Sequence, residues 1–159
     1  MTNITNITFS ELKVGDCSHL SHQVTESDIR LFAASSGDNN PVHLDAEYAS
    51  HTRFGHTIAH GMYSGVLISR VLGTQFPGPG TIYLSQSLNF CAPVLPNDTL
   101  TILLEVVALS DHKPVATLSC QITNQDEVVV CKGESVVLVP TEKQTVAMPP
   151  LPAFTEVDH

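Results

Sequence analysis

One stretch of this sequence is apolar on nearly every side, and it limits what the chain can fold into. Residues 61–76 read GMYSGVLISRVLGTQF, with Arg70 as the only charged residue. The spacing predicts a helix, and a helix without a polar face is usually buried. A proline and glycine run at residues 77–80 ends it. The fold must therefore cover this helix on most of its sides.

The second half of the chain has the pattern of β-strands. Apolar residues recur at a period of two over residues 82–90 and 100–106. In the first run they alternate with Tyr83, Ser85, Ser87 and Asn89, which are expected on the opposite face. Apolar runs at 115–123 and 128–139 follow, separated by short turns, which predicts an antiparallel meander. A further short strand is predicted at 9–14. Because such a sheet has an apolar face to bury, we expect an α+β fold in which it wraps around the helix.

The chain of 159 residues favours a single domain, which we place at residues 9–139. The proline-rich tail at 140–159 is predicted to be a surface segment or partly disordered. Four or five strands cannot cover the apolar helix completely. A second copy of the chain would complete the cover, so we expect a homodimer.

Composition restricts the partners and the location of the protein. The net charge is −9 with neutral histidines, so no nucleic-acid binding is expected. No apolar run reaches the roughly 18 residues of a membrane span, and the first residues lack the pattern of a signal peptide. The four cysteines include no C-x-x-C pair, and three lie in apolar stretches. We therefore expect a protein of the reducing cytoplasm, with no membrane partner.

The segment DNNPVH at residues 38–43 carries the strongest chemical signal. It follows a helix predicted to begin at the Thr25 cap, and Pro41 is expected to hold it extended. The carboxylate of Asp38 and the imidazole of His43 could together take a proton from water and deliver one to a carbon atom. Aspartate is common in turns and caps, so the residues alone leave open that Asp38 and Asp45 serve only the backbone.

A second polar feature stands at the start of the apolar helix. His60 and Gly61 lie there, and a helix N-terminus offers unpaired backbone N–H groups. The Gly61 amide is thus a candidate donor to a substrate oxygen on which negative charge develops, with a plain helix start as the alternative. Gly65 and Ser69 continue a small-residue face, which suits close packing on the sheet, a groove for a ligand chain, or both.

Four histidines lie close together in this part of the sequence, which raises the question of a metal site. They lack the glutamate of H-E-x-x-H, and the cysteines lack a zinc-type spacing. We therefore expect no metal. The sequence also contains neither a nucleotide-binding glycine loop nor a G-x-S-x-G elbow.

Three segments resemble the MaoC-like, R-specific enoyl-coenzyme A (enoyl-CoA) hydratases. They are FAASSGDNNPVHLDAEYA at 32–49, IAHGMYSGVLISRVLG at 58–73 and GTIYLSQSLNFCAPVLPNDTL at 80–100. The resemblance implies a single hot-dog domain, an antiparallel sheet wrapped around a long central helix. It also implies hydration of trans-2-enoyl-CoA to (R)-3-hydroxyacyl-CoA. Coenzyme A then belongs to the acyl-CoA thioester substrate, and no separate cofactor is expected.

The resemblance also implies roles for individual residues. Asp38 and His43 would be the catalytic pair that holds one water, and the Gly61 amide would polarise the thioester carbonyl. The residues expected to bind or support the substrate are Asn40, His60, Gly65 and Ser69.

The single-domain form is similar to hydratases that link fatty-acid oxidation to polyhydroxyalkanoate monomers. A hot-dog thioesterase and a non-catalytic acyl-binding module are the alternatives, because the same fold serves several functions. Arg53, Arg70 and Lys113 are candidates for contacts with coenzyme A phosphates, although each is also explained as a solvated charge.

Overall fold

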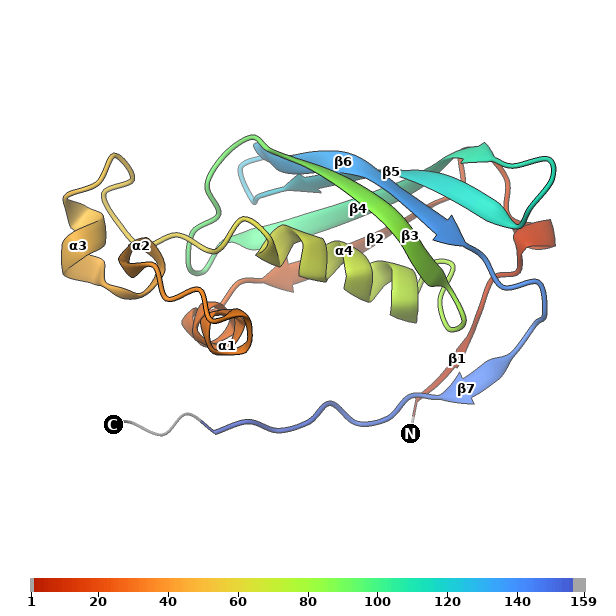
Figure 1. Cartoon of the computed structure of the whole chain (residues 1–159), viewed down its shortest axis with the longest axis horizontal. Coiled ribbons are helices and arrows are strands. Elements are labelled where there is room, and N and C mark those ends of the chain that lie inside the picture. Colours follow the sequence, from red (N-terminus) through yellow and green to blue (C-terminus); the bar gives the residue numbers. More distant parts are fainter. Residues whose placement is uncertain (1, 156–159) are drawn as a thin grey trace.

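The computed structural model describes residues 2–155 of the chain. A five-stranded antiparallel sheet curves over one helix, α4 (Tyr63–Thr74), as Figure 1 shows. The strand order is β2-β4-β5-β6-β3. This confirms the predicted α+β hot-dog architecture. The strands are β2 (Cys17–Gln23), β3 (Ile82–Phe90), β4 (Thr99–Leu109), β5 (Val115–Thr123) and β6 (Val129–Leu138).

Three shorter helices, α1 (Glu26–Ser36), α2 (Pro41–Leu44) and α3 (Ala46–Ser50), precede α4 and lie near its N-terminal end (Figure 1). The predicted start of α1 is confirmed: the side chain of Thr25 accepts the N–H of Asp28, and the Asp28 carboxylate accepts the N–H of Thr25. Gly37 ends the helix in the left-handed conformation, with φ of 76°. These caps fix where the chain leaves α1.

The core lies between α4 and the concave face of the sheet. One side of α4 is buried there, whereas Met62 and Val66 on the other side are 58% and 49% exposed. The sheet of one chain therefore covers only part of the apolar helix, as the sequence led us to expect. The buried residues of α4 are Tyr63, Ser64, Leu67, Ile68, Val71 and Leu72, and those of β4 that are fully buried are Leu100, Ile102, Leu104 and Val106.

Two predictions about strands are wrong. The segment predicted as a strand at 9–14 contains a 3₁₀ turn, Phe9–Glu11, and the first strand of the five-stranded sheet is instead β2. Strand β2 reads CSHLSHQ, an edge strand with one large apolar residue, so it shows no apolar alternation. In addition, only β4, β5 and β6 form a meander, because β3 pairs with β6 rather than with β4.

The proline-rich tail is tied to the start of the chain. Strand β7 (Thr145–Ala147) pairs with β1 (Asn3–Thr5), which the sequence did not predict. Beside this ribbon, Nζ of Lys143 donates to both carboxylate oxygens of Glu11 at 2.8 and 2.9 Å. This hydrogen bond is the main reason that the pKa of Glu11 falls to about 2. The last part of the predicted tail, 156–159, lies outside the described residues.

All four cysteines carry free thiols: Cys17 and Cys91 are exposed, and Cys120 and Cys131 are buried. Burial raises the pKa of the two buried thiols above the ordinary value, so they remain protonated. Within residues 2–155, none of the helices combines the length and the apolar composition that crossing a bilayer requires.

Candidate active site

The structure brings Asp38, His43 and His60 together at the N-terminal end of α4. One carboxylate oxygen of Asp38 and one ring nitrogen of each histidine all lie within 4.8 Å of one another. Asp38 follows directly after α1, His43 belongs to α2, and His60 precedes α4. Asp38 is exposed, His43 is half-buried and His60 is 4% exposed. The cluster therefore runs from the solvent into the core.

Asn40 and Pro41 shape the segment between Asp38 and His43. The prediction that Pro41 holds the segment extended is wrong, because Pro41 occupies the first turn of α2, where its missing N–H costs nothing. Asn40 caps this helix: its side-chain oxygen accepts the N–H of Val42 at 3.2 Å. The N–H of Asn40 in turn donates to Asp38 Oδ1 at 3.3 Å. Asn40 thus braces the loop between Asp38 and α2.

Backbone carbonyls fix the tautomers of both histidines. Nδ1 of His43 lies 2.8 Å from the carbonyl oxygen of Ile58, and because a carbonyl can only accept, Nδ1 carries the proton. Nε2 of neutral His43 then has a free lone pair. Nε2 of His60 likewise donates to the carbonyl oxygen of Asp38 at 2.9 Å. This second bond ties the backbone at Asp38 to the buried end of the cluster.

The rings of His43 and His60 stack, with centroids 3.8 Å apart and planes 28° from parallel. Phe32 packs on the other side of the cluster, with its centroid 4.7 Å from that of His60. Stacked rings direct their in-plane lone pairs side by side rather than toward a common point, so this geometry is a poor match for a shared metal ion. Nδ1 of His60 is buried without a hydrogen-bond partner among the described residues.

The spacing of Asp38 and His43 suits a single water molecule. Two hydrogen bonds of about 2.8 Å that meet at a tetrahedral oxygen span about 4.6 Å. A carboxylate oxygen of Asp38 and a ring nitrogen of His43 lie within 4.8 Å of each other, a separation that one water can bridge. A polarised water held between a base and a second proton acceptor is the requirement for general acid–base hydration.

Gly61 supplies a free backbone donor beside this pair. Helix α4 begins at Tyr63, two residues later than predicted, and the turn before it leaves the N–H groups of Gly61 and Met62 without acceptors among residues 2–155. A side chain at Gly61 would meet the ring of Phe90 at 3.4 Å, tighter than most such contacts. Glycine therefore keeps the backbone accessible at this point.

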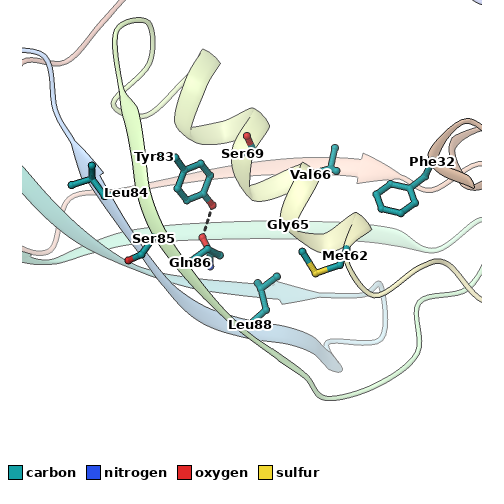
Figure 2. Close-up of a pocket in the computed structure, with 10 residues that line it drawn as sticks. All are labelled: Phe32, Met62, Gly65, Val66, Ser69, Tyr83, Leu84, Ser85, Gln86 and Leu88. Carbon is teal, nitrogen blue, oxygen red and sulfur yellow. Dashed lines mark hydrogen bonds between the residues drawn. The ribbon is translucent and has the colours of Figure 1, made fainter. Parts of the chain in front are cut away.

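Two cavities lie near the start of α4, and Gly61 lines the smaller of them. One of about 300 Å³ contains His43, Gly61 and Phe90 in its walls, together with Arg53. The second, of about 490 Å³, runs between α4 and β3 and is mostly apolar (Figure 2). We call it the acyl cavity; its walls are Phe32, Met62, Gly65, Val66, Ser69, Tyr83, Leu84, Ser85, Gln86 and Leu88.

The small residues of α4 both pack and leave room. A side chain at Gly65 would meet Leu88 Cδ1 at 3.4 Å, so this glycine allows β3 to approach the helix. Gly65 and Ser69 also line the acyl cavity, as the groove interpretation predicted. The sequence did not single out Phe32 as a site residue, nor Tyr83 and Gln86 on the opposite wall.

The three candidate phosphate contacts lie in different places. Arg53 lines the smaller cavity and stands over the ring of Phe54, 4.8 Å from its centroid. Arg70 approaches Nδ1 of His22 at 3.5 Å. Lys113 lies in the turn between β4 and β5, far from α2 and α3 (Figure 1). Only Arg53 is next to the cluster of Asp38, His43 and His60.

A sheet wrapped around a helix, with a carboxylate and two histidines gathered at the helix N-terminus, is the architecture of a hot-dog enzyme. The sequence matches the family described as MaoC like domain over residues 16–129, and the chain belongs to this family. It is 46% identical over 132 residues to an (R)-specific enoyl-CoA hydratase of Rhodospirillum rubrum, covering 83% of this chain and 91% of the relative.

Solved structures agree with this assignment. The R-hydratase PhaJ1 from Pseudomonas aeruginosa superposes with a TM-score of 0.94 and 43% identity, covering 98% of this chain and 99% of that one. The (R)-hydratase from Aeromonas caviae involved in PHA biosynthesis gives a TM-score of 0.79 and 44% identity, covering 81% of this chain and 98% of that one.

Proposed function

We propose that this protein hydrates trans-2-enoyl-CoA to (R)-3-hydroxyacyl-CoA, a reversible reaction of a hydro-lyase. The observation that carries the proposal is the Asp38–His43 pair, spaced for one water beside the free amide of Gly61. The names of the similar hydratases support the same reaction. A thioesterase or a passive acyl-binding protein would not need this pair.

In the proposed reaction, one water donates hydrogen bonds to the Asp38 carboxylate and to Nε2 of His43. The water oxygen attacks C3 of the enoyl thioester while the pair takes up its proton. The negative charge that develops on the thioester oxygen is stabilised by the N–H of Gly61. The pair then delivers a proton to C2 from the same face. Water is thus added across the double bond with no change in oxidation state.

In this proposal, each of the two cavities binds a different part of the substrate. The acyl chain occupies the acyl cavity, where Gly65 and Ser69 leave room beside α4. The thioester then lies next to Gly61, and the coenzyme A portion leaves through the smaller cavity that contains Arg53. Arg53 is consequently the first candidate for a phosphate contact, ahead of Arg70 and Lys113. In this proposal, His60 and Asn40 hold the other site residues in position and do not touch the substrate.

The test is hydration of crotonyl-CoA by purified wild type, Asp38→Asn and His43→Gln. General acid–base catalysis contributes about 10²–10⁴ in rate, so each variant should lose activity by about that factor. Asparagine retains the oxygen that accepts from Asn40, so the fold should be unchanged. The control is Asp111→Asn, an exposed aspartate in the turn between β4 and β5. Wild-type turnover by folded Asp38→Asn would refute the assignment.

The same assay separates the alternative functions. A hydratase consumes the conjugated double bond and leaves the thioester intact. Release of free thiol, detected with a thiol-reactive dye, would instead indicate a thioesterase. Tight binding of crotonyl-CoA without either change would indicate an acyl-binding module.

A homodimer is proposed from the edge of the sheet. Within residues 2–155, strand β3 pairs only with β6, and it carries exposed apolar side chains, among them Ile82 at 55% and Phe90 at 55%. Met62, which precedes α4, and Val66 of α4 line the acyl cavity and add exposed apolar surface next to it. A second copy packed along β3 would cover this surface. Analytical ultracentrifugation should give twice the chain mass of 17.1 kDa, and a monomer mass would refute the proposal.

We also propose that the protein acts in the cytoplasm, in fatty acid metabolism that supplies (R)-3-hydroxyacyl thioesters for polyhydroxyalkanoate. The free thiols at all four cysteines suit a reducing compartment. The similar hydratase of Aeromonas caviae is described as involved in PHA biosynthesis.

A further inference from the structure

A chain of polar side chains closes the end of the acyl cavity that lies farthest from the catalytic pair. The hydroxyl of Tyr83 donates to the side-chain oxygen of Gln86. The hydroxyl of Ser135 donates to the same oxygen at 2.5 Å and lies 3.0 Å from the thiol of Cys120. Polar groups at this depth are unusual in a cavity that otherwise has apolar walls, so they require an explanation.

Tyr83 reaches the cavity because of a β-bulge. Gln86 pairs with Ser135 and Leu88 with Gly133, so these residues share the face that points to α4. The register shifts between Tyr83 and Ser85, which leaves Leu84 as the extra residue. Tyr83 consequently pairs with buried Val137 and points to the same face as Gln86. Simple alternation had grouped Tyr83 with Asn89 on the opposite face, and that prediction is wrong.

The cavity runs from the catalytic end to Tyr83. Phe32, whose ring contacts His60, and Met62 lie at one end, and Tyr83 stands across from Ser69 at the other (Figure 2). Met62 and Ser69 are seven residues apart, which corresponds to about 10 Å along the helix. An acyl chain that enters beside Gly61 therefore meets the ring of Tyr83 after it has passed two turns of α4.

We propose that Tyr83 limits the length of the acyl chain that this site accepts, and that Gln86 and Ser135 hold its ring in place. This inference rests on the proposed hydratase function. Tyr83 is a specificity-determining residue in it, whereas Gln86 and Ser135 are positioning residues.

The polar chain explains why the ring stays in place although Tyr83 is 37% exposed. Ser135 is fully buried, so it cannot exchange its protein partners for water. The amide of Gln86 is held from its other side, because its nitrogen donates to the carbonyl oxygen of Ser87 at 2.8 Å. Partial burial also raises the pKa of Tyr83, so its hydroxyl keeps the proton that it donates.

The test compares kcat/KM for crotonyl-, hexenoyl-, octenoyl- and decenoyl-CoA. In hydrophobic pockets, room for one methylene typically changes discrimination by about tenfold or more. Tyr83→Ala should therefore raise the decenoyl-to-crotonyl ratio by about tenfold or more. Tyr83→Phe, which keeps the ring but loses its bond to Gln86, should raise the ratio less. Ser135→Ala should act in the same direction although Ser135 does not line the cavity.

Tyr48→Ala is the matched control, because Tyr48 is an exposed tyrosine of α3 outside both cavities. It should leave the ratio at the wild-type value. If Tyr83→Ala folds poorly, Tyr83→Leu provides the same comparison. An unchanged or lower ratio in the folded Tyr83 variants would overturn the inference while crotonyl-CoA hydration still supported the proposed function. A wild-type protein that hydrates none of the four substrates would instead refute the proposed function itself.

Discussion

The two ends of the acyl cavity are built in different ways. At the catalytic end, Asp38, His43 and His60 come from loops and a one-turn helix, and backbone carbonyls fix the direction of both imidazoles. At the far end, Tyr83 and Gln86 belong to β3 and bond to each other, and Gln86 also accepts from Ser135 of the neighbouring strand β6. We call these the loop-built end and the sheet-built end.

This difference has a physical consequence. A carbonyl of the main chain accepts from a histidine whatever the neighbouring side chains are, so it fixes the tautomer and leaves the second nitrogen for chemistry. Side-chain partners within a sheet depend on strand register, so they are rigid only while the strands stay paired. Changes at the loop-built end should therefore affect the reaction rate. Changes at the sheet-built end should affect the stability of the fold and the choice of substrate.

The largest effect on stability is expected at Gly133 of β6. A side chain there would overlap the carbonyl oxygen of Ser87 in β3, which is main chain and cannot move without breaking the pairing. Overpacking typically costs about 1–3 kcal/mol, and a clash with main chain belongs at the upper end of that range. Gly133→Ala should thus lower the free energy of unfolding by about 3 kcal/mol, measured by urea denaturation.

Gly73→Ala is the control for this prediction. A side chain at Gly73 in α4 would meet nothing within 4 Å, and alanine is favoured over glycine in helices by about 1 kcal/mol. It should leave the unfolding free energy unchanged or raise it. If Gly133→Ala unfolds at the same urea concentration as wild type, β3 and β6 are not as rigidly paired as the sheet-built end requires.

Much of the loop-built end was predictable from sequence because its signals are local. Thr25 was recognised as the cap of α1, and DNNPVH resembles a known motif, so Asp38 and His43 were assigned together. Helix α2 and its Asn40 cap were not predicted. The details that depend on three dimensions were not predictable. No sequence pattern indicates that His43 stacks on His60 or which carbonyls the two rings bond.

The sheet-built end was harder to predict for two reasons. Strand β2 is an edge strand of mainly polar residues, so periodicity could not reveal it. In β3, the bulge at Leu84 shifts the phase of the alternation, so Tyr83 was assigned to the wrong face. A bulge depends on how two strands pair, and a pattern within one strand does not record it.

A smaller stability effect is expected at His60, the buried member of the loop-built end. His60→Ala removes the donor to the carbonyl oxygen of Asp38 and the ring that stacks on His43. A buried acceptor left without its partner costs about 1–3 kcal/mol, and part of that loss should be recovered by water because Asp38 is exposed. We expect the free energy of unfolding to fall by about 1–2 kcal/mol.

The same variant tests whether His60 affects the reaction rate by positioning Asp38 and His43. Misplacement of a reacting group by about 1 Å can cost as much as 10² in rate, so kcat for crotonyl-CoA should fall by about tenfold or more while KM changes little. The control is His56→Ala, an exposed histidine outside the cluster, which should match wild type in both measurements. A variant that loses stability but keeps the wild-type kcat would show that His60 only fills the core. The orientation of Asp38 and His43 would then have to come from Asn40 and Ile58 alone, and the two ends would differ less than their construction implies.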